Sequence, residues 1–107
     1  MTFADVLAKM QSIHDRKSQD YGSNEDKLAN YRRGERLGIP TWKNIYGRLL
    51  EKSVRIESFC QNGKLNFEGV EDTLLDMANL CVLCLMAYHE QEKAKTSGEN
   101  KDSGNNS

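Results

Sequence analysis

Residues 74–88, LLDMANLCVLCLMAY, are apolar on nearly every side of a helical projection. A helix of this composition is normally buried on several sides. We therefore expect it to lie at the centre of a helical bundle or in the seam of an oligomer. We expect this third helix to begin near Asn66 or Glu68 and to run to about His89.

Two more helices are predicted before this stretch. The first begins after Thr2, which forms the pattern of a capping box with Asp5, and its apolar residues recur at helical spacing as far as Ile13. The second begins at Thr41, the expected N-cap, and ends before Asn62-Gly63. The predicted fold class is therefore all-α, an antiparallel bundle of three main helices.

Two segments lie outside these helices. Residues 22–40 contain three glycines and the chain's single proline, and they predict a long connection with a short helical turn near Asp26–Tyr31. Residues 91–107 contain no large apolar side chain, so we expect a disordered tail. The predicted division is a helical domain over residues 1–90 and a tail over residues 91–107. A domain this small buries a modest share of its surface alone, which favours a homo-oligomer.

Composition excludes several classes of protein. The chain has 107 residues, with 15 Lys and Arg against 16 Asp and Glu, and a net charge of -1 argues against a protein that coats nucleic acid. It has no run of about 18 apolar residues and no basic patch leading into an apolar stretch at its start, so we expect a cytoplasmic protein rather than a membrane or secreted one. Cys81 and Cys84 lie inside the apolar run without a second ligand pair, which favours core residues over a zinc site.

Polar residues interrupt the apolar stripes of all three predicted helices. A carboxylate such as Asp76 in apolar surroundings needs a cation, a metal or several hydrogen-bond donors. One interpretation is an internal salt-bridge network that joins Asp72 and Asp76 to Lys52 and Arg55. The other is a site in which the two carboxylates share Mg²⁺ and nearby cations contact phosphate oxygens. The polar residues on these stripes are His14, Lys17, and then Asp20 or Tyr21 on the first helix; Arg48, Lys52 and Arg55 on the second; and Asp72, Asp76 and Asn79 on the third.

Four strings within residues 5–89 carry a resemblance to a known group of proteins. They are His14-x-x-Lys17-x-x-Asp20-Tyr21-Gly22, Ala29-Asn30-Tyr31, Arg48-x-x-x-Lys52-x-x-Arg55-Ile56 and Glu71-Asp72-x-x-x-Asp76-x-Ala78-Asn79. Together they resemble small bacteriophage and prophage proteins that are similar to the MazG-like all-α nucleoside triphosphate pyrophosphohydrolases and to nucleotide-modification-associated domains.

This resemblance implies an oligomeric bundle in which acidic residues of two helices hold Mg²⁺ against a nucleoside triphosphate. Water would attack the α-phosphorus and release pyrophosphate, with the metal stabilising the developing charge. The resemblance assigns catalytic roles to Glu71, Asp72 and Asp76 and adds Glu51 to these three as a metal ligand. The MazG-like enzymes carry a Glu-x-x-Glu pair on the preceding helix, whereas here Glu51 is followed by Lys52 and Arg55, so cations replace one carboxylate.

Three functional hypotheses follow from these residues. The first is a Mg²⁺-dependent nucleoside triphosphate pyrophosphohydrolase. The second is a non-catalytic binder that sequesters a nucleotide or a nucleotide-derived signal, with Tyr21 or Trp42 stacking on the base. The third is a helical assembly or adaptor protein with no small-molecule ligand. The expected ligand-binding residues of the first two are His14, Lys17, Asp20, Tyr21, Asn30, Arg48, Lys52, Arg55 and Asn79.

Overall fold

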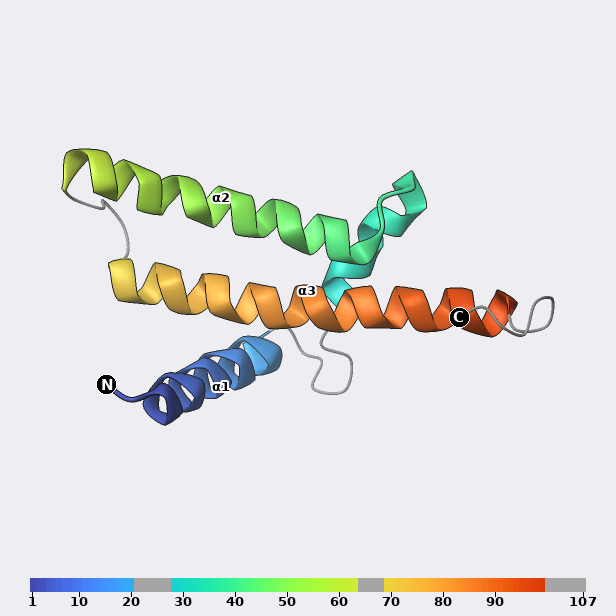
Figure 1. Cartoon of the computed structure of the whole chain (residues 1–107), viewed down its shortest axis with the longest axis horizontal. Helices are drawn as coiled ribbons and strands as arrows, with labels where there is room; N and C mark the ends of the chain where they lie inside the picture. Colours follow the sequence, from blue (N-terminus) through green and yellow to red (C-terminus); the bar gives the residue numbers. More distant parts are fainter. Residues whose placement is uncertain (21–27, 64–68, 100–107) are drawn as a thin grey trace.

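The described part of the chain is entirely helical. The computed structural model describes residues 1–20, 28–63 and 69–99, and within them it contains no β-strand (Figure 1). This confirms the predicted all-α class. The elements are α1 (Phe3–Asp20), the 3-10 helix η1 (Ala29–Leu37), α2 (Thr41–Asn62) and α3 (Val70–Glu99).

The capping box predicted for α1 is present. The backbone N–H of Asp5 donates to Thr2 Oγ1 at 3.1 Å, and the backbone N–H of Thr2 donates to Asp5 Oδ2 at 2.9 Å. Hydrogen bonds from the Thr2 backbone and side chain hold the pKa of Asp5 below its usual value. Two backbone N–H groups at the start of the helix thus each donate to a side-chain oxygen.

The boundaries of α2 match the prediction, but its N-cap does not. Pro40 is the N-cap and no side chain caps the helix, because the hydroxyl of Thr41 instead donates to Glu35 Oε2 at 2.6 Å. At the other end Gly63 adopts φ 79° and its N–H donates to the Phe59 carbonyl at 2.7 Å. Glycine reaches this left-handed conformation without steric penalty, so the predicted stop is confirmed.

α3 is longer than predicted and continues to Glu99. Residues 91–99, which were expected to belong to the disordered tail, are therefore helical, while residues 100–107 lie outside the described part of the chain. Residues 90–95, EQEKAK, are all good helix formers. Their lack of apolar side chains removes packing but not helix propensity, which explains the error. The predicted start at Asn66 or Glu68 also lies outside the described residues.

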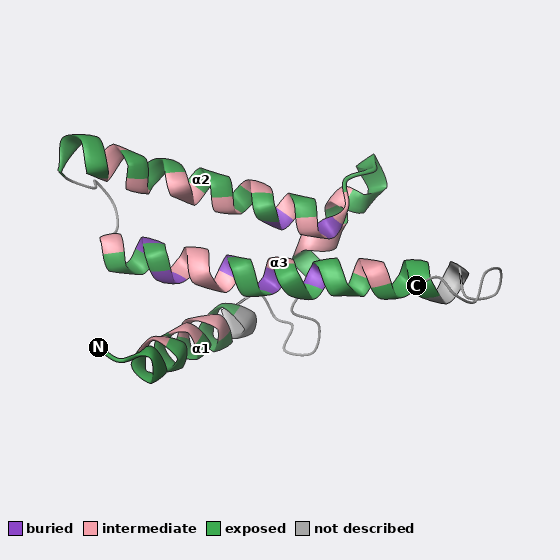
Figure 2. Ribbon diagram, viewed as in Figure 1, coloured by how far each residue is buried: buried purple, intermediate pink, exposed green. Residues whose placement is uncertain are grey.

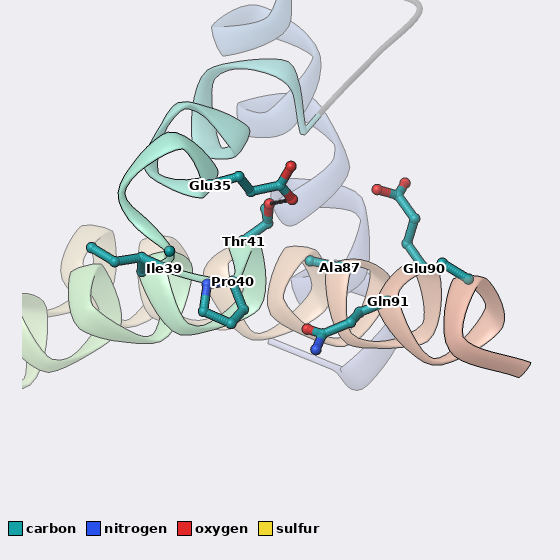
Figure 3. Close-up of a pocket in the computed structure, with 9 residues that line it drawn as sticks. Glu35, Ile39, Pro40, Thr41, Ala87, Glu90 and Gln91 are labelled. Carbon is teal, nitrogen blue, oxygen red and sulfur yellow. Dashed lines mark hydrogen bonds between the residues drawn. The ribbon is translucent and has the colours of Figure 1, made fainter. Parts of the chain in front are cut away.

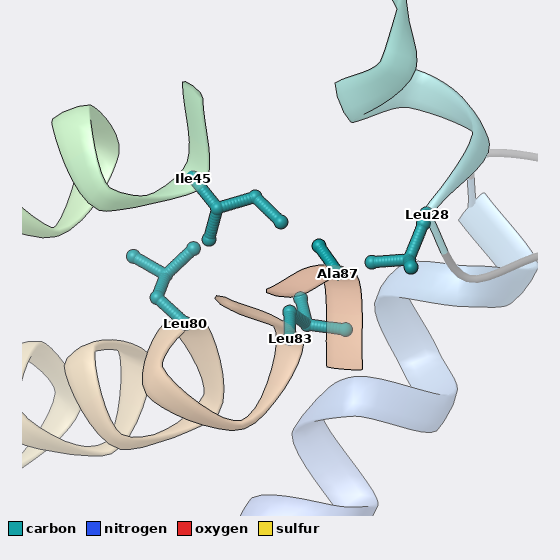
Figure 4. Packing of buried hydrophobic residues seen from close by; sticks show 5 residues of the cluster. All are labelled: Leu28, Ile45, Leu80, Leu83 and Ala87. Carbon is teal, nitrogen blue, oxygen red and sulfur yellow. The ribbon is translucent and has the colours of Figure 1, made fainter. Parts of the chain in front are cut away.

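The core lies where η1, α2 and α3 meet. α2 and α3 run antiparallel and form a long hairpin, and α3 also packs against α1, whereas α1 and α2 do not pack against each other (Figure 1). The three main helices therefore do not surround one common core. The buried cluster consists of Leu28, Ile45, Leu80, Leu83 and Ala87 (Figure 4).

η1 replaces most of the connection that was expected to be irregular. It begins at Ala29, later than the turn predicted near Asp26–Tyr31, and residues 21–27 lie outside the described part of the chain. Leu28 directly before it is buried in the core. Polar contacts fix η1 to both long helices: the side chain of Asn44 donates to the Tyr31 carbonyl at 2.9 Å, and Arg32 forms a two-pronged ion pair with Glu90 at 2.8 Å.

The apolar run of α3 is not covered on all sides within one chain. Leu74, Val82 and Leu85 are all exposed, and Figure 2 shows exposed stretches along α3. Cys81 is exposed as well, so its interpretation as a core residue is wrong for the single chain, while the thiol of Cys84 is half-buried and donates to the Trp42 carbonyl at 3.3 Å. None of the helices in the described ranges is long and apolar enough to cross a membrane.

Candidate functional site

Three helices meet at the carboxylate of Asp76. Its side chain is 12% exposed, its Oδ1 accepts a hydrogen bond from Lys17 Nζ of α1 at 3.1 Å, and its Oδ2 accepts one from Lys52 Nζ of α2 at 3.1 Å. The expectation that this carboxylate must find cations is confirmed. We call these three side chains the Lys–Asp–Lys cluster.

The cluster keeps Asp76 ionised. Burial alone would raise the pKa of its carboxyl group, but the hydrogen bonds and positive charges of Lys52 and Lys17 outweigh this effect and hold the pKa below its usual value. The charged form is the one that both lysines can contact. Asp76 therefore acts as a fixed anion that holds two ammonium groups together.

The neighbouring polar residues of α3 attach α1. The side-chain amide of Asn79 donates to the Met10 carbonyl at 3.1 Å, and Lys9 Nζ donates to Glu71 Oε2 at 2.8 Å. The hydrogen bond and charge of Glu71 raise the pKa of Lys9 above its usual value. These polar contacts, with that of Lys17, account for the interruption of the apolar stripes at these positions.

The other predicted site residues differ in their exposure and position. Arg48 is exposed and stands over the Tyr31 ring, with its guanidinium carbon 5.9 Å from the ring centre, so it contacts η1. Arg55 is exposed on α2 one turn beyond Lys52, and Asn30 is exposed on η1. His14 is half-buried on α1. Tyr21 and the side chain of Asp20 lie outside the described residues.

The predicted Mg²⁺ ligands are not gathered in one place. Both oxygens of Asp76 face lysines, Glu71 pairs with Lys9, and Asp72 and Glu51 are exposed. Across residues 1–20, 28–63 and 69–99, no three or more His, Cys, Asp or Glu side chains are grouped so that they could hold a metal ion. Mg²⁺ is bound through carboxylate oxygens, so this arrangement in a single chain does not fit it. Two of the four expected ligands, Glu71 and Asp76, contact lysine ammonium groups instead.

A second region, around η1, was not predicted from any sequence pattern. A hollow of about 380 Å³ is lined there by Glu35, Ile39, Pro40, Thr41, Ala87, Glu90 and other residues (Figure 3). Its two carboxylates are engaged, Glu35 with Thr41 and Glu90 with Arg32. The pairing of Arg32 with Glu90 joins residues 58 positions apart, which no local pattern indicates. None of the residues that line the hollow is a cation, so it does not suit a phosphate.

Comparisons of the chain with models of protein families, with curated proteins and with solved structures find no match. The resemblance of the four sequence strings therefore stays an expectation. The Lys–Asp–Lys cluster joins side chains of α1, α2 and α3 at one carboxylate.

Proposed function

We propose that the chain is a non-catalytic binder that holds the phosphate group of a nucleotide at the Lys–Asp–Lys cluster. One observation carries the proposal: lysines from two different helices converge on a single, largely buried carboxylate of a third helix. The phosphate part rests on this geometry. The nucleotide part rests on the resemblance of the four strings to nucleotide-handling proteins.

The chemistry of the ammonium group explains how a ligand would enter. An ammonium group carries three N–H donors, so Lys17, which gives one to Asp76, can also contact a phosphate oxygen. The side chain of Lys17 is 52% exposed, so solvent and ligand reach it directly, whereas that of Lys52 is 24% exposed. Charge-assisted bonds from ammonium to phosphate are stronger than neutral ones. Asp76 gathers the two ammonium groups at one place, and its negative charge also competes with a phosphate for them.

Binding without a metal follows from the same arrangement. In a pyrophosphohydrolase the carboxylates would face Mg²⁺, but here the carboxylate of Asp76 faces two ammonium groups and Glu71 faces Lys9. The positive charge that a phosphate needs is thus supplied by side chains. We expect nucleotide binding that persists when divalent cations are removed.

A thermal-shift screen of the purified chain tests the proposal. Nucleoside mono-, di- and triphosphates, cyclic nucleotides and inorganic phosphate are added in EDTA and in Mg²⁺. A ligand at about 100 times its Kd should stabilise the fold by roughly 2.7 kcal/mol. We expect a shift of equal size under both conditions and no pyrophosphate release.

Two lysine variants localise the effect. Lys17→Ala should weaken nucleotide binding about tenfold, equivalent to ~1.4 kcal/mol. Lys9→Ala is the matched control. Lys9 lies on the same helix and also pairs with a carboxylate of α3, but that carboxylate belongs to Glu71, which is outside the Lys–Asp–Lys cluster. A shift that requires Mg²⁺ and yields pyrophosphate would instead favour the hydrolase. A chain that responds to none of these compounds would contradict the proposal and favour an assembly protein.

A further inference from the structure

One side of the α2–α3 hairpin is apolar and uncovered. On α3, Leu74, Ala78, Cys81, Leu85 and Tyr88 follow one another at alternating steps of four and three residues. This is the heptad spacing of a helix that packs along a second helix. Leu85 is 58% exposed, and Leu74, Cys81 and Tyr88 are also exposed. The stripe has the spacing of a packing surface, yet four of its five residues are exposed among the residues that the structure describes.

α2 extends this surface. Tyr46, Leu50 and Val54 follow at steps of four residues and are all exposed. The edge-to-face contact between Trp42 and Tyr88, with ring centres 5.7 Å apart, links the two helices along the same side. We define the apolar face as Tyr46, Leu50 and Val54 of α2 with Leu74, Ala78, Cys81, Leu85 and Tyr88 of α3.

The apolar face points away from α1. At 100° per residue, the α3 stripe lies about 180° around the helix from Asp76 and Asn79, which contact α1. On α2 the same rotation separates Leu50 from Lys52 by about 160°. The hairpin therefore has a polar side that carries α1 and the Lys–Asp–Lys cluster, and an apolar side with no charged residue in its stripe.

We propose that the apolar face is the interface of a homodimer, in which the hairpins of two copies pack face to face as a four-helix unit. Two-fold pairing with α3 helices antiparallel, centred on Cys81, brings Leu74 opposite the second copy's Tyr88. It also brings the small Ala78 next to the second copy's Leu85, one residue from its two-fold counterpart Cys84. Large residues then meet small ones, as dense packing requires, whereas parallel pairing would set Ala78 against Ala78.

The size and character of the face suit a second copy. The segment from Leu74 to Tyr88 is about 21 Å long, and two adjacent helices span about 20 Å. The projected area of the apolar face is about 400 Å². Side chains that stand out from the helices bring the area that could be buried closer to the ~600 Å² per partner of the smaller specific interfaces. The defined face carries no charge, so it matches a neutral apolar partner rather than an acidic or basic one.

The core of the single chain explains why that partner is the chain itself. Among the described residues, only six apolar side chains are buried: Leu28, Ile45, Leu75, Leu80, Leu83 and Ala87. A core this small contributes little stability, so the apolar face must be covered whenever the chain is folded. Another copy of the same chain is always present at synthesis. The interface is independent of the proposed nucleotide site, which remains on the outer side of each hairpin.

Two measurements on the full chain test the dimer. Analytical ultracentrifugation at tens of micromolar should give twice the single-chain mass of 12.2 kDa. Leu85→Glu should reduce it to the single-chain mass, whereas Leu37→Glu, the matched control on η1 where Leu37 is 81% exposed, should leave the dimer intact. Maleimide labelling should modify Cys60 at least tenfold faster than Cys81, although both are exposed in one chain.

Three results would overturn the proposal. A wild-type chain that sediments at its single-chain mass would exclude the dimer. Cys81 reacting as fast as Cys60 would show that the face is uncovered, and this result does not depend on whether a variant folds. A Leu85→Glu chain that remains dimeric would place the interface elsewhere. None of these readouts involves a nucleotide, so failure here and failure of the proposed function are distinguishable.

Discussion

Replacing Asp76 with asparagine removes one negative charge from between two ammonium groups while keeping the shape of the side chain. Charge-assisted hydrogen bonds contribute about 1.5–3 kcal/mol each when desolvated, and exposed ion pairs contribute about 0–1 kcal/mol. The contact with half-exposed Lys17 belongs to the second class, and that with Lys52 lies between the two. We therefore expect Asp76→Asn to lower the free energy of unfolding by ~2 kcal/mol, or the Tm by roughly 10 °C.

The same substitution should strengthen anion binding. Asp76 competes with a phosphate for the two lysines, so its neutral replacement leaves their charge to the ligand. We expect Asp76→Asn to bind the best nucleotide of the screen about tenfold more tightly than the wild type, a change of ~1.4 kcal/mol. Urea unfolding measures the stability, and titration calorimetry in EDTA measures the affinity.

The contribution of Asp76 to the free energy of unfolding depends on pH. Because the folded pKa of Asp76 lies below its ordinary value of 3.8, the carboxylate stabilises the fold above that value. This stabilisation is lost as the pH falls through the folded pKa. The difference between wild type and Asp76→Asn should therefore be complete at pH 6–8 and shrink below about pH 4. Equal stabilities at pH 7, or a nucleotide affinity that falls in the variant, would refute the reasoning.

Three further predictions concern the helix ends and the thiols. Asp5→Ala removes half of the capping box and should lower the urea midpoint with a loss of helical circular dichroism; an unchanged urea midpoint would contradict this. Gly63→Ala should lower the free energy of unfolding by ~1–2 kcal/mol through the left-handed backbone alone, because an added Cβ meets no atom within 4 Å. A Tm equal to that of the wild type would show that this end of α2 adjusts freely. Burial raises the pKa of the Cys84 thiol, so at pH 8 Cys84 should react with iodoacetamide more slowly than Cys60; mass spectrometry of the labelled peptides decides, and faster modification of Cys84 would contradict the burial.

Local rules predicted the helices well because their signals are local. The capping box of Thr2 and Asp5 and the glycine stop at Gly63 involve residues no more than four apart, and both are present. The need of Asp76 for cations was predicted from the cost of burying a charge. The prediction failed at the end of α3, where the absence of apolar residues was taken to mean disorder although the residues favour a helix.

Which residues form the site depends on tertiary packing, and the spacing of residues along a helix does not predict that packing. Arg48, Lys52 and Arg55 share one side of α2, yet Lys52 contacts Asp76 while Arg48 stands over Tyr31, because η1 folds against the start of α2. Asp72 and Asp76 are one turn apart on α3, but only the side chain of Asp76 lies largely buried where three helices meet. Helical spacing predicts which residues share one side of a helix. The positions of α1 and η1 determine which of those residues meet.

α1 is attached to the hairpin by different interactions from those that hold the hairpin together. None of the side chains of residues 3–17 is buried, and the contacts of α1 with α3 described above are ion pairs and hydrogen bonds. Val6, Met10 and Ile13 of α1 are half-buried, so detaching α1 exposes less apolar surface than opening the hairpin does. This local opening should therefore respond less to urea and more to ionic strength. The hairpin, which holds the buried cluster, responds in the opposite way. Amide exchange in α1 should thus follow salt concentration, and a ligand held between Lys17 and Lys52 would slow it by tying α1 to the hairpin.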